Sequence, residues 1–301
     1  MVLDVALVGT GGMMPLPKRW LSSVLIRYEG RLALFDCGEG TQISLRALGW
    51  GLKAIDLILI SHLHGDHLAG LPGLLLTLGN AGRTEPVRVL GPTGLSQAVQ
   101  HLRVLAPVLP FEVCCQDLEP GETFSLAELR GACAAAEHHV PCLAYRLDLP
   151  RGRAFLPDRA QALGVPVQFW KRLQNGEAVD WQGGRVVPGE VLGPPRQGLS
   201  VGLVTDTRPT ARLRAFVSGV DLLICEGMYG DDDDLARAEE RKHMTFREAA
   251  TLAREAEVGR LVLTHFSPGL TEPKAYEARA REIFPATTVG EDHLTLSLSF
   301  P

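Results

Sequence analysis

The chain of 301 residues carries a formal net charge of −5 at pH 7, and 46% of its residues are hydrophobic. These values are typical of a globular protein, and the acidic balance excludes a global basic field, so binding to nucleic acid would require a local basic patch. Six cysteines without CxxC spacing predict reduced thiols and a cytoplasmic location. No apolar run has the length of a membrane helix, so no membrane association is expected.

Short apolar runs, several of them uninterrupted by polar residues, predict strands that are buried on both faces. They lie at 3–9, 22–28, 32–36, 56–60, 87–91, 144–149, 199–205, 221–226, 260–265 and 294–300. Helices are expected at 38–49, at 91–106 with Thr93 as its cap, at 245–259 and at 272–284. Antiparallel-looking pairs near both ends, together with strand–helix alternation elsewhere, predict an α/β (α+β) fold over residues 1–301. Two stacked sheets would carry helices on their outer faces, an αββα sandwich.

The composition of the sequence changes over about residues 150–198, where proline and glycine recur and no periodic element is expected. Such a long irregular segment is usually functional or mobile, and we interpret it as an inserted arm. Between 146 and 172, six basic residues stand against two acidic ones, with Phe169 and Trp170 beside Lys171 and Arg172. Composition alone fits equally well a solvated loop with a packed aromatic pair and a basic surface for RNA.

The stretch SHLHGDHLAG, residues 61–70, follows the buried run 56–60 and crowds four ligand-type side chains into six positions. These side chains are His62, His64, Asp66 and His67. In extended chain His62 and His64 share a face, whereas Asp66 and His67 follow a turn at Gly65 and can face a second ion. The spacing therefore predicts a metal site, but one loop completes neither four-coordinate shell.

Further ligands are expected at the ends of other apolar runs. His138 or the adjacent His139, Asp206 and His265 stand at such positions. Taken singly, each would be interpreted as a capping aspartate or a half-buried histidine rather than as a metal ligand. Because all of them follow apolar runs, the same sheet edge that holds residues 61–70 is predicted to gather them.

These motifs resemble a known family. GTGG, FDCGEGTQ, SHLHGDHLAGLPGLL, EHHVPCLAYRL, TDTRP, LICEG, KHMTFREAATLAREA and LTHFS occur in the order and spacing of the ribonuclease Z family, at the length of its short form. That family belongs to the metallo-β-lactamase-fold hydrolases. The resemblance implies two zinc ions, although manganese or iron would also suit such ligands. It assigns His62, His64 and His138 to one ion, Asp66, His67 and His265 to the other, and Asp206 to both.

The resemblance also implies an activity, the endonucleolytic removal of the 3′ trailer from precursor tRNA, and a homodimer. His243 in KHMT resembles the histidine that protonates the leaving oxygen, and Glu226 in ICEG resembles the carboxylate that orients it. Asp66 is expected to accept a proton from the attacking water. The arm is implied to grip the tRNA body, although VPVQFW replaces the family's usual PPGPLF there.

Expected substrate contacts are basic residues in two places. The glycine-rich VGTGGMM lacks the third glycine of a dinucleotide site, and Pro15 and Pro17 block a following helix, so it predicts a loop near the metals. The residues expected to meet phosphate are Lys18 and Arg19 in that loop and Arg151, Arg153, Lys171 and Arg172 in the arm. The acidic run 231–234 is expected to be solvated rather than a metal site.

Two alternatives remain at this point. The same metals would serve a phosphodiesterase or arylsulfatase-like hydrolase of small esters. A protein that kept the fold but lost turnover would instead be a non-catalytic RNA-binding protein.

Overall fold

The computed structural model describes residues 2–301, which divide into two units. The larger unit consists of residues 2–148 and 199–299, and the smaller consists of residues 149–198 with Phe300 and Pro301. Within the described residues, the larger unit contains two seven-stranded sheets.

The first sheet combines an antiparallel half with a parallel half. β3 begins the parallel half, because it pairs in parallel with β4, as β4 does with β5 and β5 with β6. The strand order is β16 (Thr295–Ser299), β1 (Val2–Gly9), β2 (Ser23–Tyr28), β3 (Arg31–Phe35), β4 (Ile55–Leu59), β5 (Val87–Pro92) and β6 (Val113–Leu118).

The second sheet is built in a similar way. β12, β13, β14 and β15 are parallel neighbours, whereas β7, β8 and β9 form an antiparallel meander. The strand order is β15 (Thr287–Val289), β14 (Leu261–Thr264), β13 (Leu222–Glu226), β12 (Arg196–Val204), β9 (Leu143–Arg151), β8 (Leu129–Ala135) and β7 (Thr123–Leu126).

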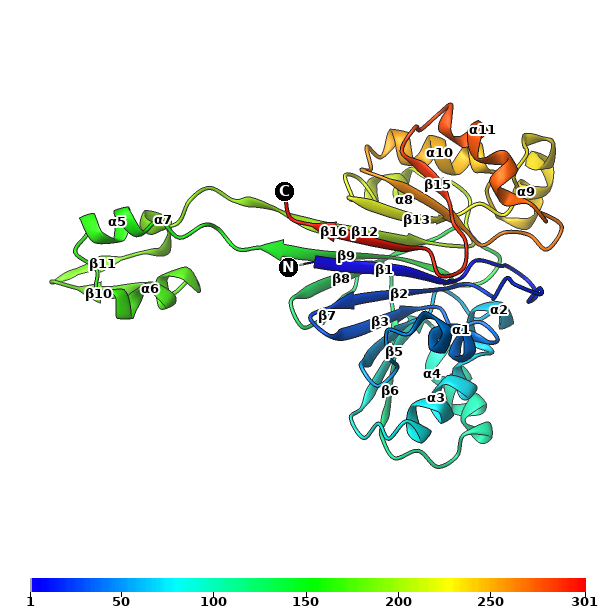
Figure 1. Cartoon of the computed structure of the whole chain (residues 1–301), viewed down its shortest axis with the longest axis horizontal. Helices are drawn as coiled ribbons and strands as arrows, with labels where there is room; N and C mark the ends of the chain where they lie inside the picture. Colours follow the sequence, from blue (N-terminus) through cyan, green and yellow to red (C-terminus); the bar gives the residue numbers. More distant parts are fainter. Residues whose placement is uncertain (1) are drawn as a thin grey trace. The chain divides into compact units, whose positions relative to one another are not determined.

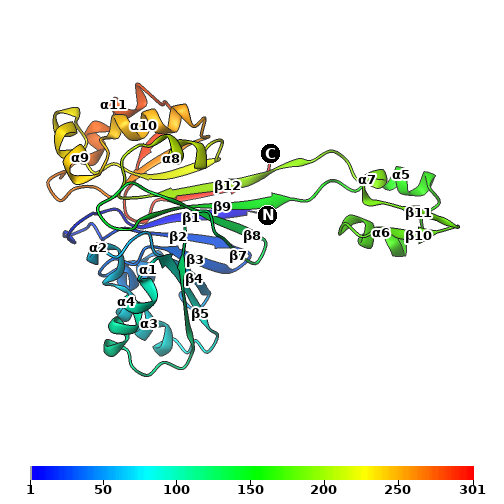
Figure 2. The same cartoon turned by 180° about the vertical axis from the view of Figure 1, so that it is seen from behind.

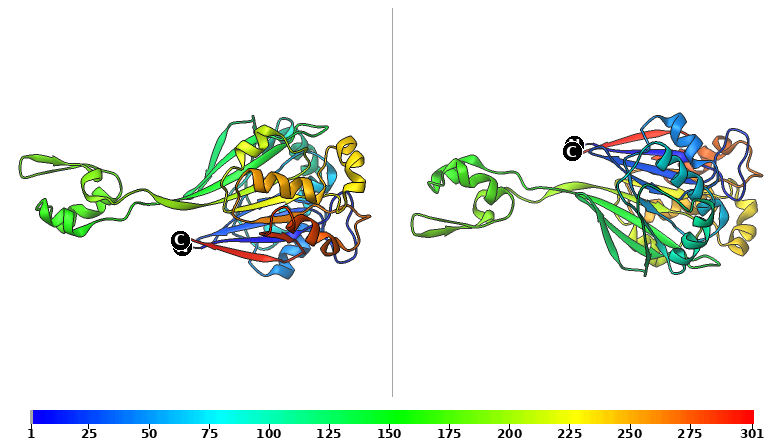
Figure 3. Two further views of the ribbon diagram at one scale, coloured as in Figure 1. Left: turned by 90° about the horizontal axis from the view of Figure 1, so that it is seen from above. Right: turned by 90° about the horizontal axis from the view of Figure 1, so that it is seen from below.

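Helices cover the outer faces of the two stacked sheets (Figure 1, Figure 2). α1 (Thr41–Leu48), α3 (Leu71–Asn80) and α4 (Leu95–Leu102) pack their leucines and valines on the first sheet. α8 (Ala211–Phe216), α10 (Phe246–Glu255) and α11 (Glu277–Arg281) pack on the second. Views from above and below show these two helical layers on opposite sides of the sheets (Figure 3). The αββα layering predicted from the apolar runs is therefore present.

Shorter helical segments lie between these elements. α2 (Gly65–Leu68) follows β4, and η1 (Arg103–Leu105) follows α4. η2 (Asp232–Asp234) leads into α9 (Leu235–Arg241), and η3 (Pro273–Tyr276) leads into α11. No helix among residues 2–301 is long and apolar enough to cross a membrane.

The helix predicted at 91–106 begins later than expected. α4 starts at Leu95 with Gly94 as its N-cap, and the hydroxyl of Thr93 donates instead to Glu119. The Asp117 carboxylate on β6 accepts hydrogen bonds from the backbone N–H groups of Gly94 and Ser96. Thr93 is therefore not the cap, because a side chain from the neighbouring strand satisfies the first N–H groups.

The smaller unit contains regular elements, so the expectation that none occurs over 150–198 is wrong. They are α5 (Pro157–Ala162), α6 (Val167–Gln174), β10 (Val179–Trp181), β11 (Gly184–Val186) and α7 (Pro188–Val191). Each is too short to show a periodic pattern in sequence. A small core holds them together, formed by Ala160, Val165, Leu173, Val179, Val186 and Val191 with Phe155, Phe169, Trp170 and Trp181 against it.

Candidate metal centre

Polar side chains follow several parallel strands at the point where each strand ends. Residues 61–67 come after β4, Asp206 after β12 and His265 after β14, while Glu226 is the last residue of β13. Parallel strands bring their carboxyl ends to one edge of a sheet, which is where α/β proteins build sites. The gathering predicted for these residues therefore follows from the topology.

The first group of ligand-type atoms contains three imidazoles and one carboxylate. Nε2 of His62 lies 2.9 Å from Nδ1 of His64, and Nε2 of His138 lies 3.4 Å from the same atom. An Oδ2 atom of Asp206 lies 3.5 Å from Nε2 of His62 and 3.8 Å from Nε2 of His138. His139 lies apart, exposed, with its ring 3.2 Å from the carbonyl oxygen of Glu240.

The second group uses the other oxygen of the same aspartate. Oδ1 of Asp206 lies 3.0 Å from Nε2 of His265 and 3.3 Å from Nε2 of His67. Oδ2 of Asp66 lies 3.4 Å from Nε2 of His67 and accepts a hydrogen bond from the backbone N–H of Met13. The two oxygens of Asp206 thus face the two groups separately.

The donor set fits a divalent metal. The rings of His67 and His265 are fully buried. The Nε2 atom of each ring has no hydrogen-bond partner among the described residues. A buried polar atom left unpaired is costly, and imidazole nitrogens with carboxylate oxygens are the usual ligands of zinc and related ions. Both atoms belong to the second group, and a cation bound there would satisfy them.

The surroundings of Asp206 favour its ionised form, which is the form that binds a cation. Burial alone would raise the pKa of its carboxyl, but the rings of His265, His67 and His62 outweigh burial and hold that pKa well below its usual range. Burial lowers the pKa of His62 well below normal, and the nearby His67 adds to the effect. The carboxylate is therefore ionised and the His62 ring neutral at pH 7, as metal ligation requires. Burial alone would lower the pKa of the His67 ring, but Asp206 and Asp36 outweigh burial and raise it well above normal, so a metal bound there would have to displace a proton.

Buried groups hold the ring orientations of His67 and His265. Nδ1 of His67 lies 2.7 Å from Oδ2 of Asp36, whose other oxygen accepts from the backbone N–H of Ser61. Nδ1 of His265 lies 2.6 Å from the hydroxyl of Ser22. Sequence reasoning missed these supports, although Asp36 ends an apolar run just as His265 does.

Three of these positions have left-handed backbone. Asp36, Asp206 and His265 have φ values of 57°, 46° and 58°. Such values in residues other than glycine cost free energy and persist only where the surroundings impose them. The strand ends therefore turn sharply here, which aims consecutive polar side chains into one small volume.

A histidine and a glutamate complete the centre. Nδ1 of His243 lies 3.2 Å from Oε2 of Glu226, and the same oxygen accepts a hydrogen bond from the backbone N–H of Met244. The other oxygen, Oε1, accepts from the backbone N–H of Thr207. Nε2 of His243 lies 3.9 Å from Oδ2 of Asp206 and so faces the ligand groups. The predicted pair is thus assembled beside the candidate metal ligands.

Similarity to known proteins agrees with this geometry. Residues 22–194 match the model of the metallo-β-lactamase superfamily. The sequence is 46% identical to a ribonuclease Z of Clostridium kluyveri and 45% identical to one of Lachnoclostridium phytofermentans, each over 99% of both chains. The crystal structure of human tRNase Z, short form, matches with a TM-score of 0.70 and 26% identity over 99% of both chains.

The chain belongs to the ribonuclease Z family. The family and the fold class predicted from the sequence are thereby confirmed, and the chain is a hydrolase of the metallo-β-lactamase superfamily.

In this member of the ribonuclease Z family, most of the ligand-type residues line a cavity of about 240 Å³. His64, Asp66, His138, Asp206, His243 and His265 line it, together with Met13, His139, Met228, Tyr229, Arg237 and Arg241. The two arginines were not predicted, because nothing in the sequence of a polar surface helix distinguishes them from solvated charges.

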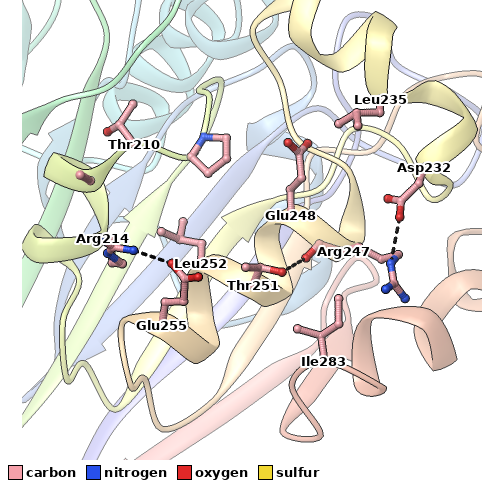
Figure 4. A pocket seen from close by; sticks show the side chains of 12 residues that line it. Thr210, Arg214, Asp232, Leu235, Arg247, Glu248, Thr251, Leu252, Glu255 and Ile283 are labelled. Carbon is pink, nitrogen blue, oxygen red and sulfur yellow. Dashed lines mark hydrogen bonds and ion pairs between the residues drawn. The ribbon is translucent and has the colours of Figure 1, made fainter.

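A second cavity, of about 460 Å³, lies between α8 and α10 and contains none of the candidate ligands (Figure 4). Its charged side chains are engaged with one another or with neighbours. Arg214 pairs with Glu255, Arg247 with Asp232, and Glu248 with Arg208. The cavity therefore offers a ligand little free charge.

The predicted phosphate contacts do not line the metal cavity of this ribonuclease Z family member. Lys18 and Arg19 line a separate hollow, and Arg19 donates hydrogen bonds to the carbonyl oxygens of Leu270 and Thr271. In the smaller unit, Arg151 donates to the carbonyl oxygen of Pro301, Arg153 to those of Gly193 and Leu192, and Arg172 pairs with Glu177, whereas Lys171 is exposed. Their contact with RNA remains a prediction.

Proposed function

We propose that the protein is a dinuclear zinc endoribonuclease that removes the 3′ trailer from precursor tRNA. The observation that carries this proposal is the position of Asp206, whose two carboxylate oxygens face two separate groups of ring nitrogens. Two ions held in this way are the usual arrangement for hydrolysis of phosphodiesters. Relatives named ribonuclease Z that match over the full length support the choice of substrate.

The proposed ligand assignment follows the two groups. His62, His64 and His138 would hold one ion, Asp66, His67 and His265 the other, and Asp206 both. When bound, such a pair of ions lowers the pKa of water and stabilises negative charge on an in-line phosphoryl transition state. Asp66, at the edge of the cavity, would accept a proton from the attacking water.

His243 would protonate the departing 3′ oxygen. Its Nε2 atom faces the ligand groups, while Glu226 engages its Nδ1 atom from behind. This arrangement keeps the Nδ1 proton directed at the carboxylate and leaves the Nε2 proton available to the substrate. Protonation of the leaving group typically accelerates such reactions by about 10²–10⁴-fold.

The smaller unit would bind the body of the tRNA. Its support is compositional, since basic residues are concentrated between 146 and 172. The six cysteines are unpaired, which supports a cytoplasmic location. We also infer a homodimer from the family, and light scattering over a range of protein concentrations would test it.

The decisive experiment compares zinc-loaded protein with the His243→Ala variant on a precursor tRNA that carries a 3′ trailer. We expect cleavage next to the discriminator nucleotide and a loss of at least about 100-fold in the variant. Metal analysis should return close to two ions per chain for both proteins. The proposal would be abandoned if the unsubstituted protein, loaded with zinc or manganese, left the trailer intact.

A hydrolase of small phosphodiesters is the second candidate. It is favoured by the internal contacts of Arg153 and Arg172, which occupy guanidinium groups that RNA would otherwise use. Hydrolysis of bis-p-nitrophenyl phosphate at a higher kcat/KM than precursor tRNA would support it.

A further inference from the structure

The short helix α9 presents two arginines to the metal cavity. Arg237 and Arg241 stand four residues apart, so their side chains project from the same face of the helix. Both line the cavity that contains His64, Asp66 and His243. Two guanidinium groups therefore lie at the wall of the space where the reacting phosphodiester would be placed.

These arginines are less engaged than others nearby. Arg237 is exposed, its closest carboxylate, that of Asp234, is 4.0 Å away, and its guanidinium lies 5.4 Å from the centre of the Tyr229 ring. Arg241 is also exposed. Arg208, by contrast, is tied by two hydrogen bonds to Glu248. A guanidinium without a close carboxylate keeps its paired donors free for a phosphate.

The position of α9 relative to the proton donor is fixed by packing and by the segment around it. Ala238, on the inner side of α9, is buried against Met228 and Tyr229. The backbone N–H of His243 donates to the carbonyl oxygen of Ala238 at 2.8 Å. The backbone of α9, which carries both arginines, is therefore held beside His243.

The acidic run before α9 anchors the helix rather than being simply solvated. Asp231 pairs with Arg279, and Asp232 pairs with Arg247 and accepts a hydrogen bond from the hydroxyl of Thr245. These carboxylates are engaged away from Arg237 and Arg241. Asp234, the last residue of the run, is the exception, since its carboxylate lies 4.0 Å from the guanidinium of Arg237. Asp231 and Asp232 therefore do not neutralise the two arginines.

We propose that Arg237 and Arg241 bind the backbone phosphates of single-stranded RNA beside the scissile linkage. This inference rests on the proposed function and adds a contact point inside the larger unit, independent of the arm. Guanidinium–phosphate contacts carry no base information, so they would position any sequence. They would also raise the local concentration of an anionic substrate in the cavity.

The test measures binding of zinc-loaded protein to a fluorescent oligoribonucleotide that spans the trailer junction, by anisotropy at 4 °C over a series of KCl concentrations. A gel confirms that the RNA stays intact. The variant Arg237→Ala/Arg241→Ala is compared with Arg212→Ala/Arg254→Ala, which removes the same charge from exposed positions on α8 and α10 outside the cavity.

We expect the α9 double variant to bind about tenfold or more weakly. The slope of log K against log salt should become shallower by about 1.4, since each phosphate contact to a single strand contributes about 0.7. Metal content should equal that of the unsubstituted protein. The α8/α10 double variant should change neither affinity nor slope, and Arg237→Lys/Arg241→Lys should retain most of the slope while losing part of the affinity.

Equal affinity and slope in the α9 double variant and the unsubstituted protein would overturn the inference, as would an equal loss in the α8/α10 variant. Failure of the unsubstituted protein to cleave precursor tRNA would instead overturn the proposed function. The two failures are distinguishable because the binding comparison requires no cleavage.

Discussion

Ser22 controls which nitrogen of His265 carries a proton. The hydroxyl of Ser22 lies 3.0 Å from the carbonyl oxygen of Gly11 and 2.6 Å from Nδ1 of His265. A serine has one proton, and the carbonyl can only accept. The serine oxygen must therefore accept from Nδ1–H of His265, which leaves Nε2 of that ring as a bare lone pair.

We therefore predict that Ser22→Ala weakens binding of the metal at His265. Supporting hydrogen bonds of this kind are typically worth about 10–100-fold in metal affinity. Competition with a chromophoric chelator would measure the loss, and Ser22→Thr, which keeps the hydroxyl, should restore most of the affinity. Unchanged affinity in Ser22→Ala would show that the hydrogen bond does not orient the ring.

His243 is charged over most of the accessible pH range. Burial alone would lower the pKa of its ring, but the Glu226 carboxylate outweighs burial and raises the pKa to about 9. The protonated form therefore predominates below pH 9 and is lost as the pH rises through that value. A proton donor with these properties remains active at neutral pH.

In the Glu226→Gln variant the pKa of His243 should fall, because the charge that stabilises the protonated ring is gone while its approximate shape remains. We expect the alkaline limb of the kcat/KM profile on precursor tRNA to move to lower pH. Measuring the profile for both proteins from pH 6 to 10 would show the shift. An unmoved alkaline limb would mean that another group controls it.

At the scale of elements, Arg208 links two parts of the centre. It lies in the loop after β12, and it donates hydrogen bonds to the carbonyl oxygen of His243 and to the Glu248 carboxylate on α10. Glu248 in turn forms a capping box with Thr245 at the start of α10. Arg208 therefore joins the loop that carries Asp206 to the segment that carries His243, in addition to the bridge that Glu226 makes between Thr207 and Met244.

Replacing Arg208 with alanine should release His243 from its position. We predict a loss of about tenfold or more in kcat on precursor tRNA with little change in metal content. Hydrolysis of bis-p-nitrophenyl phosphate should fall less, because nitrophenolate leaves without being protonated. Arg214→Ala, which breaks the exposed pair with Glu255, is the matched control. Equal losses on both substrates would point to a general structural role.

The sequence predicted those elements and ligands that depend only on residues close together in the chain. The run 56–60 corresponds to β4 at Ile55–Leu59, and the ligands that directly follow apolar runs are brought together as expected. The helix α3 was missed because its sequence, LPGLLLTLGN, is apolar almost throughout and is interrupted by proline and glycine. The strands β6 to β8 were also missed, and β7 is only four residues long. Ser22 was missed because its partner, His265, lies far along the chain. The arginines of α9 were missed because only the folded chain brings that helix to the metal cavity.

At the scale of the molecule, metal and stability should be coupled. Among the described residues, the centre buries two imidazoles, those of His67 and His265, whose Nε2 atoms lack hydrogen-bond partners. A ligand that binds only the folded state stabilises it by mass action. We expect chelation to lower the melting temperature and zinc to restore it, with about 2.7 kcal/mol gained at a free metal concentration of 100 Kd. Differential scanning calorimetry would test this, and Asp206→Asn should abolish the zinc response. A melting temperature unaffected by chelation would contradict the prediction.

The smaller unit should be required for cleavage of precursor tRNA but not for hydrolysis of small phosphodiesters. Replacing residues 152–195 with a short glycine–serine linker removes α5 to α7 but leaves every candidate metal ligand in place. We predict that cleavage of precursor tRNA collapses while hydrolysis of bis-p-nitrophenyl phosphate persists, because remote binding energy contributes only to the larger substrate. Retained tRNA cleavage would show that the arm is dispensable.

The same insertion affects how the chain folds. β9 and β12 are neighbours in the second sheet, yet residues 152–195, which form most of the smaller unit, lie between them in sequence. Joining two strands across such a loop costs conformational entropy that grows by about 0.6 kcal/mol for each doubling of loop length, so a roughly tenfold shorter connection would save about 2 kcal/mol. We therefore expect β9 and β12 to pair more slowly than they would across a short turn.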